Sequence, residues 1–171
     1  MTDESMQVNA RPASADDEAF LYELYRSTRA EELEAWGLDE SQQKSFLELQ
    51  FAARQRHYDI AFSGAEHKII LCGDRPAGRI LVYRSEHEIR LVDIALLPEY
   101  RQRGFGASLI RGLLCEAKEK GKAVTLHVDT LNRAGRLYER LGFSVVGDIG
   151  GSYKMEWRPA TPRKSKETET E

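Results

Sequence analysis

Apolar residues recur at helical spacing in the first third of the chain and at strand spacing further on. A first amphipathic helix is predicted to begin at Ser14, because Asp17 three residues later completes a capping-box pattern. Its inner face carries residues at i, i+3, i+4 and i+7 spacing, namely Leu21, Leu24, Tyr25 and Thr28. A second helix is predicted from near Asp39 or Ser41 to about Tyr58. Its core face is partly polar, with Leu47, Phe51, Arg54 and Tyr58.

The rest of the pattern predicts short strands and two further helices, separated by turn residues. Strands are predicted at 8–12, 68–72, 77–83, 88–97, 123–128, 143–146 and 153–157, and helices at 104–120 and 132–141. The 88–97 strand is the most continuously apolar and is expected to be central. Gly121 and Gly142 stand where the two later helices should end. The mixture of helices and strands indicates an α/β or α+β class.

One domain, residues 8–157, is expected, because no internal repeat and no linker rich in Gly, Ser or Pro interrupts the pattern. Residues 1–7 are polar and unpatterned, and 158–171 form a charged tail without a large apolar group. Both ends are therefore expected to be disordered. A chain of 171 residues can bury enough surface to fold without disulfides or a structural metal.

Composition and charge exclude several classes of function. The formal net charge is −3, which gives no general attraction to nucleic acid or to anionic lipid. The start has neither a basic nor an apolar signal region, and no apolar run is long enough to cross a bilayer, so a cytoplasmic location is expected. Cys72 and Cys115 lie in apolar segments without metal-ligand spacing, so both are expected to be buried thiols, and no metal site is expected.

The loop before the third predicted helix carries the clearest chemistry. An apolar strand leads into a segment with Arg101, Arg103, Gly104 and Gly106, and a helix opens directly from it. Free N–H groups, the positive helix end and two glycines without a Cβ together favour phosphate binding. The alternative is a helix start that caps itself, with its arginines in solvent. The segment is not a P-loop, and Leu109 stands where a dinucleotide fingerprint would need its third glycine.

Two segments, 101–106 and 132–143, carry a more specific pattern. The first, Arg-Gln-Arg-Gly-Phe-Gly, follows a strand that runs into Leu-Pro-Glu-Tyr. The second, Asn-Arg-Ala-Gly-Arg-Leu-Tyr-Glu-Arg-Leu-Gly-Phe, spans a short helix and the start of a strand. Together they resemble two motifs of the GNAT superfamily of acyl-CoA-dependent N-acyltransferases. The resemblance covers about residues 66–157 and implies a mixed, mostly antiparallel sheet of six to seven strands, with a diverging central parallel pair and about four flanking helices.

The resemblance implies acetyl-CoA as co-substrate and an amine as acceptor. Main-chain groups of the central strand would bind the pantetheine arm, and amides of residues 102–107 would bind the pyrophosphate. Tyr138 would be the general acid for the leaving thiolate, unless it is a core tyrosine, and Asn132 would touch the cofactor arm, unless it only caps a helix. The implied cofactor-binding residues are Ile94, Ala95, Leu96, Arg101, Gln102, Arg103, Gly104, Phe105, Gly106, Ala107 and Asn132.

The general base stays open, because Arg90 stands where several GNAT enzymes have a glutamate. His127 occupies a second base position of the family, and an imidazole suits that task. Its alternative role is a half-buried strand histidine with a satisfied hydrogen bond. Asp93, flanked by apolar residues, is a further candidate; the alternative is structural pairing with Arg90 or with a neighbouring strand.

These features predict an enzyme that transfers an acetyl group from acetyl-CoA to a primary amine, by direct attack in a ternary complex. The alternative is a domain that binds acyl-CoA as a sensor without turnover. Partners beyond the cofactor and the amine, such as nucleic acid or membrane, are not expected. The acceptor, the length of the acyl group and the choice between monomer and homodimer are left open.

Overall fold

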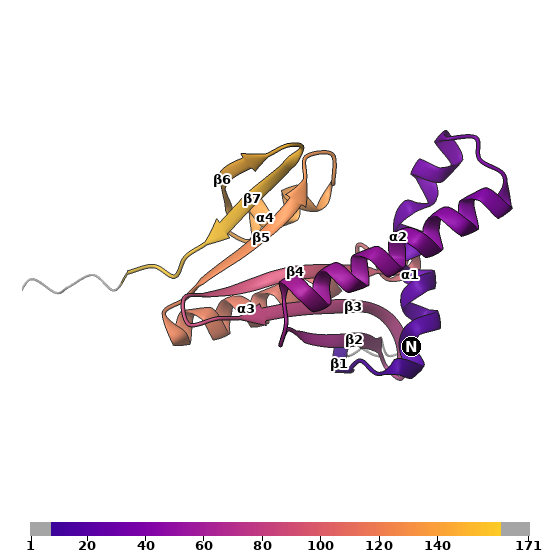
Figure 1. The fold of residues 1–171 in the computed structure, drawn as a ribbon. Coiled ribbons are helices and arrows are strands. Elements are labelled where there is room, and N and C mark those ends of the chain that lie inside the picture. The colour runs from indigo at the N-terminus through magenta and orange to yellow at the C-terminus, as the bar shows by residue number, and fades with distance from the viewer. Residues whose placement is uncertain (1–7, 162–171) are drawn as a thin grey trace, which may run out of the picture.

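The computed structural model describes residues 8–161, which form one seven-stranded sheet of order β1-β2-β3-β4-β5-β7-β6 (Figure 1). Its strands are β1 (Val8–Pro12), β2 (Glu66–Cys72), β3 (Arg75–Arg84), β4 (Glu88–Leu96), β5 (Ala123–Asp129), β6 (Ser144–Ile149) and β7 (Ser152–Trp157). The helices are α1 (Glu18–Ala35), α2 (Glu40–Ala61), α3 (Phe105–Lys120) and α4 (Ala134–Arg140), with 3-10 turns η1 (Ala15–Asp17) and η2 (Pro98–Tyr100). The predicted class and the predicted mixed sheet with four helices are confirmed.

The expected single domain, 8–157, lies within the described range, whereas the expected disorder of 1–7 and of most of the 158–171 tail falls on residues outside it. Across residues 8–161, no helix combines the length and the apolar character needed to cross a bilayer.

Local side-chain hydrogen bonds start the first two helices. Before α1, the Asp17 carboxylate accepts a hydrogen bond from the Ser14 amide (2.8 Å) and two from the Arg11 guanidinium (2.7 and 2.8 Å). These contacts, led by Arg11, hold the pKa of Asp17 well below its usual range. At α2, Asp39 and Gln42 form a reciprocal capping box, with bonds of 2.8 and 3.1 Å.

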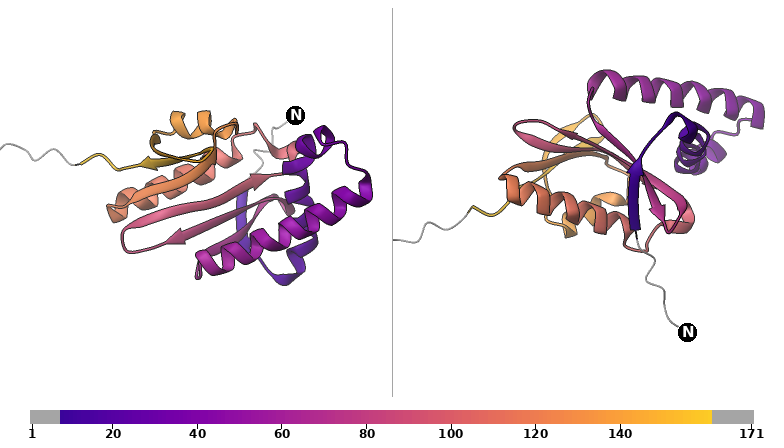
Figure 2. Two further views of the ribbon diagram at one scale, coloured as in Figure 1. Left: turned by 45° about the horizontal axis from the view of Figure 1, so that its top comes forward. Right: turned by 90° about the horizontal axis from the view of Figure 1, so that it is seen from below.

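The helices cover both faces of the sheet (Figure 2). Helices α1 and α2 lie on one face, where Leu21, Leu47 and Phe51 form a small core with Ile69 of β2. Helices α3 and α4 lie on the other face, over the larger core built from the apolar residues of β3, β4 and β5. A β-strand presents alternate residues to opposite faces, so each strand also contributes polar residues to the α2 side.

Two side chains expected in the interior are at the surface. Cys115 is exposed, because the buried stripe of α3 passes through Leu114 and Ala117 and turns its neighbour away from the sheet. Thr28 of α1 is also exposed, and its hydroxyl donates to the Tyr25 carbonyl (2.7 Å).

Strands β4 and β5 are the parallel pair, and they diverge. Their register runs from Glu88 opposite Ala123 only as far as Leu91 opposite Leu126. Beyond that point β4 continues to Leu96 paired with β3 alone, and β5 continues paired with β7 alone. Figure 1 shows the two strands side by side at one end and apart at the other. The diverging ends leave main-chain edges without a strand partner, at the position that the family resemblance implies for a ligand arm.

Candidate active site

The segment between β4 and α3 has an unusual concentration of unpaired amides. Among the described residues, the six N–H groups of 102–107 have no main-chain acceptor, and the first helical bond of α3 is donated by Ser108 to the Gly104 carbonyl (3.0 Å). The backbone turns sharply here, with positive φ at Gln102 (58°) and Gly104 (80°). A side-chain bond from Arg101 Nε to the Leu96 carbonyl (2.9 Å) ties the turn to the end of β4.

This segment fits a phosphate ligand. A Cβ added at Gly106 would meet no atom of the chain within 4 Å, so the space in front of this glycine is open. The guanidiniums of Arg101 and Arg103 flank the loop at exposed positions, and Arg103 lies over the Tyr100 ring (6.0 Å to its centroid). Unpaired amides at the start of a helix, together with two basic side chains, form a site for an anion such as a pyrophosphate.

The fold brings Tyr138 to the diverging strands. This residue lies on α4, is buried, and packs edge-on against Phe143 (5.8 Å between centroids). Burial, and to a lesser degree the charge of Asp93, raises the pKa of Tyr138 to about 12, so the phenol is protonated at neutral pH. Within residues 8–161 no hydrogen-bond partner of its hydroxyl occurs, and a ligand could therefore accept its proton in a hydrogen bond.

Asp93 lies on the α2 face because a β-bulge interrupts the β3–β4 register between Leu81 and Val82. Its carboxylate binds two arginines, Arg54 Nη2 of α2 (3.0 Å) and Arg79 Nε of β3 (3.3 Å). The alternative of structural pairing with Arg90 or with a neighbouring strand is therefore met by Arg79 of β3, and Arg90 is not the partner. Because Asp93 is the ion-pair partner of two guanidiniums, the structure supports the structural interpretation of this residue.

Neither arginine of this cluster was predicted to be a site residue, although Arg54 was placed on the core face of the second helix. Arg54 also donates from Nε to the Tyr58 hydroxyl (2.6 Å), and Arg79 donates to Gln55 (2.9 Å). The Arg79 side chain is only 5% exposed. Arginines are rarely buried this far unless they form an ion pair, as Arg79 does with Asp93. The sequence offered one signal, a polar inner face on the second helix, but nothing in it identified the partner of Arg54.

His127 is exposed on β5 rather than half-buried. Its Nδ1 accepts a hydrogen bond from Arg90 Nη2, and because a guanidinium cannot accept, the ring proton must reside on Nε2. Desolvation, Arg90 and Lys154 lower the pKa of His127, which favours this neutral form. The only lone pair of the neutral ring is therefore already used, and this geometry does not support a general-base role.

Asn132 caps α4. Its Oδ1 accepts a hydrogen bond from the Ala134 amide (2.9 Å), so it acts much as the predicted cap would, one residue earlier in the chain. Among the described residues its side-chain nitrogen has no hydrogen-bond acceptor, so contact with a ligand through that atom stays a prediction. No group of three metal-ligating side chains occurs within residues 8–161.

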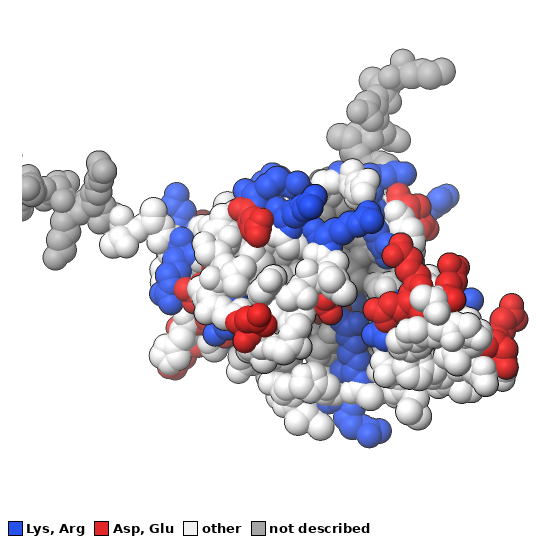
Figure 3. All heavy atoms as spheres, turned by 90° about the horizontal axis from the view of Figure 1, so that it is seen from above, with Lys and Arg blue, Asp and Glu red and all other residues white. Residues whose placement is uncertain are grey.

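The space between the two halves of the molecule is lined by basic side chains. Figure 3 shows Lys and Arg gathered in the hollow between the α1–α2 half and the β5–β7 half. On the α2 face, the guanidiniums of Arg54 and Arg79 share the carboxylate of Asp93, and Arg90 lies on the same face without an ion pair within the described residues. An acceptor that approaches from this face therefore meets a positive environment.

Comparisons with known proteins agree with this geometry. Residues 20–143 match the model of the acetyltransferase (GNAT) family. The [ribosomal protein bS18]-alanine N-acetyltransferase of Haemophilus influenzae is 43% identical over 67 residues, which are 39% of this chain and 45% of that protein, so the match spans less than half of the relative.

Solved structures of low sequence identity share the fold. The PaiA N-acetyltransferase of Thermoplasma acidophilum, crystallised with coenzyme A, superposes with a TM-score of 0.67 at 22% identity, over 90% of this chain and 99% of that one. The ribosomal-protein-S18-alanine N-acetyltransferase of Escherichia coli gives a TM-score of 0.61 at 18% identity, over 93% and 99%. The family match covers more than half of the chain. The fold of the chain, the diverging strands β4 and β5 and the unpaired amides of 102–107 agree with that match. The chain therefore belongs to the GNAT family of N-acetyltransferases.

Proposed function

We propose that this enzyme transfers an acetyl group from acetyl-CoA to the α-amine of a peptide or protein N-terminus. The observation that carries the donor half of the proposal is the run of six unpaired amides, 102–107, beside the diverging ends of β4 and β5. The acceptor half rests on two observations. The Asp93 carboxylate is already paired with two arginines, and the imidazole lone pair of His127 already accepts from Arg90.

The cofactor would lie between the diverging strands. The free edge of β4 at Ile94, Ala95 and Leu96 would pair with the amide groups of the pantetheine arm as an added strand would. The 102–107 amides, with Arg101 and Arg103, would hold the pyrophosphate. This arrangement directs the sulfur end toward Tyr138, the buried phenol beside the same strands.

The pKa of the acceptor amine indicates which class of amine this site can use. An amine must be neutral to attack, and at pH 7 this costs about 4.6 kcal/mol for a lysine side chain of pKa 10.4, but only about 1 to 1.4 kcal/mol for an α-amine of pKa 7.7 to 8.0. Because neither Asp93 nor His127, the two predicted bases, is free to accept a proton, an amine that is partly neutral by itself fits best. The relative that acts on an alanine of ribosomal protein bS18 supports this class of acceptor.

In the proposed step the amine nitrogen bonds to the thioester carbonyl carbon and the carbon–sulfur bond breaks, with its electron pair going to sulfur. The proton lost by the nitrogen goes to solvent. The Tyr138 hydroxyl donates a hydrogen bond to the departing thiolate. A phenol whose pKa is raised to about 12 stabilises that charge as a donor and need not transfer its proton fully.

Replacing Tyr138 with phenylalanine is expected to lower kcat about 10- to 100-fold, because thiolate stabilisation is lost while the ring and its packing on Phe143 remain. The measurement is the rate of thiol release at saturating acetyl-CoA. Tyr22→Phe on α1 is the matched control and should keep full activity. An unchanged kcat in the Tyr138 variant would assign Tyr138 to the core only.

The pH profile should follow the acceptor rather than His127. For an α-amine, kcat/KM is expected to rise about tenfold per pH unit up to about pH 8 and then to level off. The pKa of His127 is lowered, away from the range where the α-amine titrates, so His127→Gln should keep the same limb. If kcat/KM of the His127→Gln variant no longer rose with pH, His127 would be the general base.

An amine panel tests the proposed function directly. Thiol release from acetyl-CoA should be fastest with N-terminal amines of short peptide amides and at least tenfold slower with the same peptides carrying a blocked α-amine and a free lysine. Mass spectrometry of the products should place the added acetyl group on the α-nitrogen. Turnover with lysine amines alone would contradict the proposal.

A further inference from the structure

Arg90 is an arginine without a carboxylate partner. Among the described residues, several other arginines form ion pairs, including Arg11, Arg54, Arg79 and Arg84, but no Asp or Glu oxygen lies within 4.0 Å of Arg90. Its guanidinium instead lies over the Phe62 ring (5.6 Å to the centroid) and donates to His127 Nδ1. Most of its five N–H donors are thus left without an acceptor within the described part of the chain.

His127 adds a second donor at the same place. Because Nδ1 accepts from Arg90, the neutral ring presents an N–H at Nε2, and no acceptor for that group occurs among residues 8–161. Lys154, the cross-strand partner of His127 on β7, adds positive charge nearby. The adjacent Glu88 adds a negative charge to this place, but it forms no ion pair with Arg90 within 4.0 Å, and one of its oxygens accepts from the Thr125 hydroxyl (3.0 Å).

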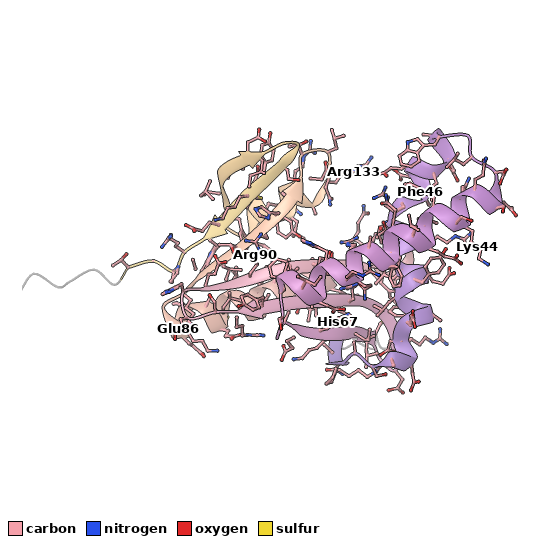
Figure 4. All side chains as sticks on the ribbon, viewed as in Figure 1. Lys44, Phe46, His67, Glu86, Arg90 and Arg133 are labelled. Atoms are coloured by element: carbon pink, nitrogen blue, oxygen red, sulfur yellow. The ribbon has the colours of Figure 1, made fainter. Side chains whose placement is uncertain are left out.

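The position of this pair in the fold points to the acceptor. Arg90 precedes Leu91, the last β4 residue paired with β5, so the pair lies where the strands begin to diverge. Figure 4 shows Arg90 in the space between β4 and the β5–β7 half. Asp93 lies three residues after Arg90 on β4, roughly 10 Å along an extended strand. Besides burial, the charge of Asp93 acts on Tyr138, where it raises the pKa of the phenol. A group bound at Arg90 would therefore belong to the acceptor, one or two residues from its reacting amine.

We propose that Arg90 and His127 bind a carboxylate of the acceptor, so that the enzyme prefers N-termini followed closely by an acidic residue. This inference rests on the proposed function. A carboxylate accepts two hydrogen bonds from donors in this arrangement and offsets the charge of the Arg90 guanidinium, which has no ion-pair partner among the described residues, whereas Arg54 and Arg79 share Asp93. An acceptor with a basic second residue would instead be repelled.

The test compares peptide amides that differ at the second residue, Ala-Asp-Ala-NH2, Ala-Asn-Ala-NH2 and Ala-Lys-Ala-NH2, and adds free Ala-Ala to supply the carboxylate from a chain end. Wild-type kcat/KM should favour aspartate over asparagine about tenfold or more. Arg90→Gln should reduce this ratio to near one, and Arg90→Glu should favour lysine. A faster reaction with free Ala-Ala than with the aspartyl peptide would assign the carboxylate to a small dipeptide rather than to an acidic side chain.

Controls separate this inference from the proposed function. Arg111→Gln, at an exposed position of α3 on the opposite face, should keep the wild-type ratio, and coenzyme A affinity should be unchanged in all variants. Equal rates with the aspartyl and asparaginyl peptides would overturn the carboxylate site but leave α-amine acetylation standing. If no peptide turns over, the His127 ring signals in NMR decide: they should shift with N-acetyl-Ala-Asp-Ala-NH2 and not with its asparagine analogue, and an equal response to both would overturn the site.

Discussion

Gly106→Glu is expected to weaken coenzyme A binding about a hundredfold while leaving the fold intact. The new side chain would place bulk and a negative charge in front of the unpaired amides of 102–107, where the pyrophosphate is proposed to bind. Its Cβ would fit without a clash, since an added Cβ at Gly106 has no non-neighbouring atom within 4 Å. An acidic residue in the first turn of a helix is also compatible with the helix dipole. Calorimetric titration with coenzyme A measures the effect.

Gly112→Glu is the matched control, because this glycine lies on the same helix and also faces open space. It should bind coenzyme A as the wild type does, with a similar thermal midpoint. Gly104 is less suitable for the test, since its φ of 80° would strain any other residue and mix a folding effect with a binding effect. Unchanged affinity in the Gly106 variant would remove the pyrophosphate from this loop.

Sequence periodicity predicted most of the elements because each one is determined locally. The capping pair Asp39 and Gln42 marks the start of α2, and the left-handed Gly121 marks the end of α3. The unpaired amides of the loop were predictable for the same reason, since a strand that leads into a glycine-rich helix start leaves those donors free. Local signals of this kind need no knowledge of distant contacts.

The acceptor side was harder to predict, because its residues come from distant parts of the chain. Asp93 meets Arg54, which is 39 residues away, and Arg79, and neither pairing has a local sequence signal. The β-bulge that turns Asp93 toward α2 breaks the simple alternation of strand faces. The hydrogen bond between Arg90 and His127 depends on the parallel alignment of β4 and β5, so a residue suited to be a base by sequence has its lone pair occupied in the fold.

Gly78 is a position that sequence reasoning passed over and that should have the largest effect on stability. An added Cβ there would lie 2.1 Å from the Ala95 carbonyl oxygen and 2.8 Å from Leu96 Cδ2. The first of these atoms is main chain of β4, so it cannot turn away as a flexible side chain would. A glycine inside a strand commonly marks such a close approach of another backbone.

Gly78→Ala is therefore expected to lower the free energy of unfolding by about 3 kcal/mol, which corresponds to a fall of roughly 6–12 °C in the thermal midpoint for a domain of this size. Because the displaced residues belong to the β4 edge proposed to bind the pantetheine arm, coenzyme A affinity should fall as well. Gly147→Ala in β6 is the matched control, since its Cβ would make an ordinary contact with Lys154 Cβ at 3.7 Å. Thermal unfolding and coenzyme A titration of both variants measure these effects; equal midpoints would mean that β4 can move away from β3 without cost, and a lower midpoint with unchanged affinity would place the cofactor arm away from Ala95 and Leu96.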